Sequence, residues 1–310
     1  MRSPGSRTHV LWLLVAELRK LIRPLVWGTG LVITGFCLLI TWGGANNARG
    51  ALASPRIPDV CARAATAQCR QVVAHAHAAA RTAAAATSLL AQPGEIGHVA
   101  AGMLASVPGL LLIALIAGGH WGGEWGSRTI RHLLARQGRR TLVLAAKWLT
   151  IWAAGVAALV CCWLVLAVAA PLIAAGAGLP AAHASMWAGL GSSASAAGRA
   201  VIVLGLFAAV GTAAGAIARG QLATTAITAG SMLLALLVAG ITSIGRLSPA
   251  SFVQAWMNFD TAGYLPTNFW SRFVSGGPQP GELAGLVGIV LTGAIAAAIA
   301  RWRFSADVTV

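Results

Sequence analysis

GEWGSRTIRHLLARQGRR, residues 123–140, is the most charged stretch of a chain that is otherwise mostly apolar. Ser127 can cap a helix in which Ile130, Leu133 and Leu134 share one face. Such a helix of about 8 residues, roughly 12 Å long, is too short to be stable alone. We therefore expect a short cytoplasmic coupling helix that rests on neighbouring helices and turns its polar side toward a partner.

The composition around this segment excludes an ordinary soluble domain. The chain of 310 residues is 57% hydrophobic and 9% charged, whereas about a quarter of the residues of a soluble domain are charged. The net charge of +15 would indicate nucleic-acid binding in a soluble protein, but here the basic residues lie in loops beside apolar runs. We therefore expect an all-α polytopic membrane protein in contact with membrane lipid, with no nucleic-acid partner.

Apolar runs on both sides of the segment predict six transmembrane helices within a single domain, residues 1–310. Pro108 lies inside the second run and predicts a kink. Gly211 and Gly215 form a GxxxG pattern in the fourth, which lets helix backbones approach closely. The predicted spans are residues 25–44, 99–119, 147–175, 201–218, 222–244 and 283–300.

Three further segments carry the remaining predictions. Residues 8–22 have the pattern of an amphipathic interfacial helix, with Glu17 on its polar face. Residues 45–98 form a long polar loop, expected to be extracytoplasmic and helical in two pieces. Residues 246–281 are rich in aromatic residues and interrupted by charges, which predicts interfacial or re-entrant helices, beginning with a Ser248 cap.

The distribution of basic residues predicts the orientation in the membrane. Most of the 22 lysines and arginines lie in the amino-terminal segment, in residues 123–147 and in the carboxy-terminal tail. Residues 128–140 alone contain five arginines, and the density of positive charge in short loops sets topology. We therefore expect a multi-pass protein of the cell membrane with both termini in the cytoplasm.

The sequence carries little that predicts catalysis. It has no G-x-x-x-x-G-K-[ST] motif, so we expect no ATP binding by a P-loop in this chain. Apart from Lys147 at a boundary, the predicted spans contain no Asp, Glu, Lys or Arg, which argues against ion-coupled transport. His75 and His77 would point about 200° apart on a helix, which argues against joint metal binding. These two, His120 and His132 are expected at the surface, and we predict no catalytic, cofactor or metal site.

Two of the five cysteines lie in a loop rather than in an apolar run. Cys61 and Cys69 would face the oxidising side of the membrane, where a disulfide is permitted. On one continuous helix they would be about 12 Å apart, too far for a bond. A Cys61–Cys69 disulfide would therefore need a break between them or a partner chain, and both alternatives stay open.

The charged segment resembles the cytoplasmic loop between the second and third spans of type-2 ABC exporter permeases, a family that includes drug and antibiotic exporters. An acidic residue precedes Gly-x-x-Thr-x-Arg-x-Leu-Leu, and an arginine pair and a lysine follow. The residues that carry this resemblance, and the ATPase-coupling role it implies, are Glu124, Gly126, Thr129, Arg131, Leu133, Leu134, Arg139, Arg140 and Lys147.

The resemblance implies a function and partners. The expected activity is that of a permease subunit, working as a homodimer or heterodimer above separate ATP-binding subunits that hold the ATP and Mg²⁺. The small-residue-rich apolar spans suit a hydrophobic or amphiphilic cargo, such as a drug, a peptide antibiotic or a lipid-like compound. A secondary transporter or channel and a membrane scaffold without transport activity are the alternatives. An adjacent gene for a soluble ATPase would favour the permease.

Overall fold

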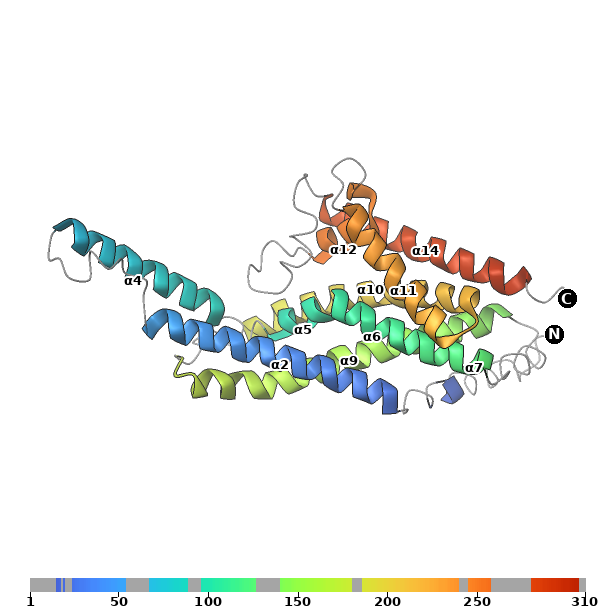
Figure 1. The fold of residues 1–310 in the computed structure, drawn as a ribbon, viewed down its shortest axis with the longest axis horizontal. Helices are drawn as coiled ribbons and strands as arrows, with labels where there is room; N and C mark the ends of the chain where they lie inside the picture. The colour runs from blue at the N-terminus through green and yellow to red at the C-terminus, as the bar shows by residue number, and fades with distance from the viewer. Residues whose placement is uncertain are drawn as a thin grey trace.

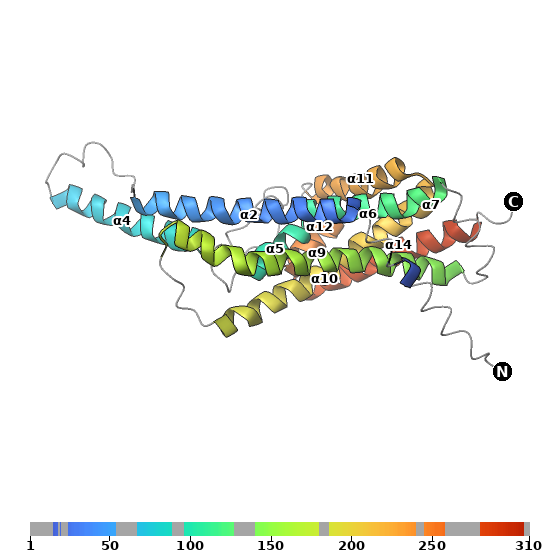
Figure 2. The same cartoon turned by 90° about the horizontal axis from the view of Figure 1, so that it is seen from below.

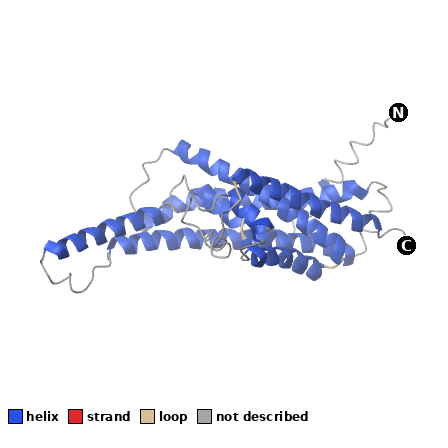
Figure 3. Ribbon diagram, turned by 90° about the horizontal axis from the view of Figure 1, so that it is seen from above, coloured by secondary structure: helices blue, strands red, loops and turns tan. Residues whose placement is uncertain are grey.

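The structure is a computed structural model. It describes residues 15–17, 19, 24–53, 67–88, 96–126, 140–179, 186–239, 245–257 and 280–306. Within these ranges the chain forms ten α-helices and no strand (Figures 1 and 3). The all-α fold class expected from the sequence is confirmed.

Five helices are long and apolar enough to cross a membrane, and a bent helix pair makes up to a sixth. The five are α2 (Pro24–Ala53), α9 (Arg140–Gly176), α10 (Met186–Ala218), α11 (Gln221–Ala239) and α14 (Glu282–Ala306). The chain is therefore a multi-span helical membrane protein. The six apolar runs seen in the sequence correspond to these six elements.

The bent pair is the second predicted span. It consists of α5 (Ile96–Leu104) and a continuation made of α6 (Val107–Ala117), the π-helix η3 (Gly118–Gly122) and α7 (Gly123–Gly126). The two parts meet at 53°. Pro108 lies in the first turn of α6, where its missing N–H costs least, so the predicted kink is found at this break.

Three helices extend well beyond the predicted spans, namely α2, α9 and α10, and α10 begins at Met186 rather than at residue 201. The 37 residues of α9 extend over about 55 Å, and the 30 residues of α2 over about 45 Å. Their far ends are joined by a small apolar cluster that contains Ala45, Ala48, Ala177 and Leu179. Beside them α4 (Ala67–Ser88) packs along α2 and projects past the rest of the bundle (Figures 1 and 2).

The opposite end of the bundle is where the charged segment, residues 123–140, begins. The start of α2, the end of α7, the start of α9 and the end of α14 all lie there (Figure 1). α10 and α11 form the predicted hairpin, turning through Arg219, which has a φ of +53°. α6 and η3 pack closely against the GxxxG face of α10. A Cβ at Gly211 would lie only 2.8 Å from Ala117, so a larger residue there would collide with α6.

The segment before the last span is described in part. It contains a 3₁₀ turn, η4 (Gly245–Leu247), and α12 (Pro249–Met257), which packs against α14. The predicted cap is confirmed, because the Ala250 N–H donates to Ser248 Oγ at 3.3 Å. Residues 258–279 of the predicted interfacial segment lie outside the described residues.

Candidate functional site: a buried ionic cluster

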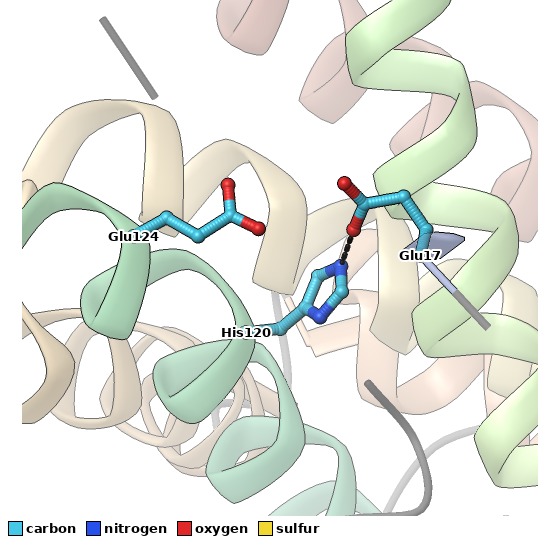
Figure 4. A group of neighbouring side chains, drawn as sticks. All are labelled: Glu17, His120 and Glu124. Carbon is cyan, nitrogen blue, oxygen red and sulfur yellow. Dashed lines mark ion pairs between the residues drawn. The ribbon is translucent and has the colours of Figure 1, made fainter. Parts of the chain in front are cut away.

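Four ionisable side chains from four segments meet inside the bundle at the end where α7 stops. They are Glu17 from the amino-terminal segment, His120 from η3, Glu124 from α7 and Lys147 from α9, and we call them the ionic cluster (Figure 4 shows the first three). Their exposed fractions are 1%, 6%, 4% and 0%, respectively. The cluster is therefore removed from water on all sides.

Lys147 lies between the two carboxylates. Its Nζ is 2.6 Å from Glu124 Oε2 and 3.8 Å from Glu17 Oε2. Glu17 Oε2 is in turn 2.8 Å from His120 Nε2. A buried ammonium or carboxylate is tolerated only when it is paired, so each member of the cluster depends on the others.

Glycines let η3 reach the hairpin of α10 and α11. A Cβ at Gly118 would lie 2.1 Å from Thr225 Oγ1, and one at Gly122 would lie 2.2 Å from Gln221 Cα. Any side chain at either position would push η3 away from α11. Since residues two apart on a helix point in different directions, this contact leaves His120 to face away from α11 and toward the cluster.

Trp121 closes the cluster on another side. The Lys147 Nζ lies 5.0 Å from the centroid of its ring, a cation–π contact, and Phe304 of α14 meets the ring edge-on at 5.8 Å. The ring lies against Gly215 of α10, where a Cβ would be only 2.3 Å away. Trp121 thus links Lys147 to α10 and α14, and the second glycine of the GxxxG pattern makes room for it.

The cluster also presents the donor set of a metal site. Glu17, His120 and Glu124 each offer one ligand atom, and these atoms lie within 4.8 Å of one another. Carboxylate oxygen and imidazole nitrogen suit divalent ions such as Zn²⁺. However, the ammonium of Lys147 already supplies a cation to both carboxylates. We therefore interpret the arrangement as an internal ion-pair network.

Some of the predicted coupling residues lie in described helices, and the others lie in the undescribed segment between α7 and α9. Glu124 and Gly126 lie in α7, and Arg140 begins α9, where its guanidinium donates to the Ser305 carbonyl at 3.2 Å. Residues 127–139 lie outside the described residues, and they include Thr129, Arg131, Leu133, Leu134 and Arg139. Lys147, expected at the foot of a span, lies about two turns after the start of α9.

The expectation that His120 lies at the surface was wrong, because it is buried against Glu17. Glu17 was predicted on the polar face of residues 8–22, and its side chain meets ionisable groups rather than water. The physical reason is Lys147, whose buried charge needs acidic partners. The sequence did contain one indication of a buried ion pair: a single lysine inside an otherwise apolar helix. A buried lysine must be paired with an acidic group somewhere in the fold.

The other predicted positions lie at the far end of the molecule. His75 and His77, which point to different sides of α4, are both exposed, as expected. Cys69, also on α4, is disulfide-bonded, whereas its predicted partner Cys61 lies outside the described residues.

No protein-family model, curated protein or solved structure matches this chain.

Proposed function

We propose that this chain is the membrane-spanning subunit of an ATP-driven exporter, of the kind that the charged loop resembles. Six candidate spans and an arginine-rich segment between the second and third of them support this proposal. ATP and Mg²⁺ would be held by a separate subunit docked against residues 127–139. The permease would act as a dimer, with itself or with a second permease.

The observation that carries the proposal is the 2.6 Å ion pair between Glu124 and Lys147. Glu124 lies just before the proposed docking segment, and Lys147 lies one to two turns into the helix that follows it. The pair therefore ties together the two helices that a docked ATPase would push. A displacement of residues 127–139 would reach both helices, and through Glu17 also the amino-terminal segment.

This geometry changes the role that we propose for Glu124. The carboxylate is buried and directed at Lys147, so it is suited to transmit movement within the permease rather than to contact the ATPase. Arg131 and Arg139 keep the proposed docking role. The two roles can be tested separately. Changing Glu124 should affect the coupling of ATP hydrolysis to transport, and changing the arginines should affect association with the ATPase.

The proposed orientation has two supports. The disulfide of Cys69 fits an oxidising compartment at the α4 end, and α7 and the start of α9, which flank the arginine-rich residues 127–139 in the sequence, lie at the other end. We expect an impermeant thiol reagent, added to intact cells, to label Leu90→Cys but not Gly138→Cys. The reverse pattern would invert the proposed topology.

Secondary transport remains a second candidate because of the ionic cluster itself. Buried ionisable groups in membrane proteins frequently serve as ion relays. The cluster lies near one end of the bundle, about 10 Å along α9 from its first residue, rather than at its middle. This position favours a coupling role over an ion site at the membrane midplane.

The test uses the full chain reconstituted with a soluble ATPase encoded by a neighbouring gene, a partner that the proposal requires. We expect no ATP hydrolysis by the permease alone and cargo-stimulated hydrolysis by the complex. Glu124→Gln should leave association intact while lowering stimulation about tenfold, whereas Arg131→Ala should weaken association. Glu282→Gln, at the other end of the bundle, is the matched control and should change neither. Transport driven by an ion gradient without ATP would overturn the proposal.

A further inference from the structure

A long groove runs between α9, α10 and α14 and opens to the outside of the bundle. Its volume is about 690 Å³, within the range of sites that bind small molecules. It is lined by apolar side chains and glycine, apart from the two indoles of Trp148 and Trp152 and three polar residues: Thr141, Thr212 and Arg301. The groove lies apart from the ionic cluster.

All three polar residues lie at the same end of the groove. Trp152 Nε1–H donates to the Val201 carbonyl at 2.9 Å, and Trp148 Nε1–H donates to the Gly205 carbonyl at 3.1 Å. α9 and α10 are therefore antiparallel, and this register brings Thr141 beside Thr212. The bond from Arg140 to the Ser305 carbonyl places the end of α14, and with it Arg301, at the same level.

The groove has the length of one lipid leaflet. From Ile289 to Arg301 the wall formed by α14 extends over about 18 Å, and from Thr141 to Trp152 the wall of α9 extends over about 17 Å. Half of a hydrocarbon core of about 30 Å is about 15 Å. A chain lying in the groove would thus reach from the membrane surface to the midplane.

The walls are held in place without a ligand. The rings of Trp148 and Trp152 stack at 5.8 Å with 2° between their planes, and both N–H groups are bound to α10 as described above. Opposite them, a Cβ added at Gly293 would meet no atom within 4 Å. The groove is therefore open and rigid at its centre, and a larger side chain at position 293 would fill it rather than disturb the packing of the protein.

From this geometry we propose that the groove binds one anionic membrane phospholipid, with an acyl chain against Trp148 and Trp152 and the phosphate at Arg301. The exposed guanidinium of Arg301 stands where the headgroup level would be, so charge favours an anionic lipid over a zwitterionic one. The site depends on the chain spanning a membrane but not on the proposed transport function.

The experiment compares photoactivatable phosphatidylglycerol with phosphatidylcholine of identical acyl chains, each with a diazirine in the chain. The purified full-length protein is illuminated in detergent with each lipid, and labelled peptides are quantified by mass spectrometry. We expect phosphatidylglycerol to label α9, α10 and α14 around the groove about fivefold more than phosphatidylcholine, which is the effect of one basic residue near an anionic headgroup.

Two variants and a control distinguish the contribution of the acyl chain to lipid binding from that of the headgroup. Gly293→Phe should reduce groove labelling by both lipids at least fivefold. Gly230→Phe on α11 is the matched control, because a Cβ there also meets no atom within 4 Å, and it should leave groove labelling unchanged. Arg301→Gln should remove the preference for phosphatidylglycerol while labelling by phosphatidylcholine persists.

Three results would overturn the proposal. Labelling spread evenly over the outward faces of α2 and α11 would mean ordinary bulk lipid. Absence of groove labelling in the wild type, together with cross-links between two copies through α14, would mean that a second copy covers the groove. Equal labelling of wild type and Arg301→Gln by phosphatidylglycerol would remove the headgroup contact. Arg301 is exposed, so this variant keeps the test decisive if Gly293→Phe fails to fold.

Discussion

Two ion pairs of the same length stabilise opposite ends of the bundle. Lys147 Nζ to Glu124 Oε2 and Arg199 Nη2 to Glu282 Oε1 are both 2.6 Å. The first pair is almost completely buried, whereas the side chains of Arg199 and Glu282 are 25% and 48% exposed. Glu282 starts α14, and Phe304, which lies beside the ionic cluster, is about 33 Å further along the same helix.

The difference shows that an interatomic distance does not set the energy of an ion pair. Water screens Arg199 and Glu282, so either can lose its partner and be solvated instead. Arg199 also donates to the Trp256 carbonyl at 2.8 Å and lies over the Trp256 ring, contacts that do not need Glu282. Lys147 is completely buried, so water cannot replace a lost partner, and removing one member of its pair leaves a charge in a dry site.

Loss of Lys147 is expected to have the largest effect. Lys147→Met should lower the free energy of unfolding by about 3–5 kcal/mol, because it leaves two buried carboxylates without their cation. Denaturation of the purified protein in detergent measures this. The double variant Lys147→Met with Glu124→Gln should recover part of the loss. A cost below about 1 kcal/mol would show that the cluster is hydrated.

Displacement of Trp121 tests whether the exclusion of water from Lys147 causes the energy difference between the two ion pairs. Gly215→Leu should cost about 1–3 kcal/mol, because a side chain there must push the Trp121 ring off Lys147. Gly198→Leu on the same helix is the control, because a Cβ at Gly198 meets no atom within 4 Å. Thermal unfolding midpoints of the two variants are compared, and equal midpoints would refute the sealing role of Trp121.

Neutralising the exposed pair should have the smallest effect. Glu282→Gln is expected to change the free energy of unfolding by about 0.2–1 kcal/mol, and less as the salt concentration rises. The same denaturation assay at low and high salt checks this. A loss as large as that of Lys147→Met, or one that salt does not reduce, would remove the contrast between the two ends.

The elements that depend on local pattern were predictable from the sequence. Apolar runs located the six span elements, Pro108 located the bend, and Ser248 located the start of α12. The helix ends were less predictable. α2 continues to Ala53 because its alanine-rich continuation still favours helix and α4 packs on it, so the end of the apolar run is not the end of the helix.

The ionic cluster could not be read from local pattern. An amphipathic helix shows that Glu17 is on a polar face, but not whether that face meets water or a lysine 130 positions later in the chain. Glu124 likewise looked like a surface charge because it begins a charged segment. Burial of these residues depends on four segments meeting, and periodicity within one segment carries no information about that.

The π-helix η3 accommodates one residue more than a regular helix of the same length would hold. A π-helical residue turns the chain by about 80° and an α-helical residue by about 100°, so the five residues of η3 turn it by about as much as four α-helical residues. Deleting Gly119 would therefore let η3 relax to a regular α-turn with Glu124 still directed toward Lys147. This short glycine-rich stretch is thus the place where the helix can lose one residue without losing the ion pair that follows it.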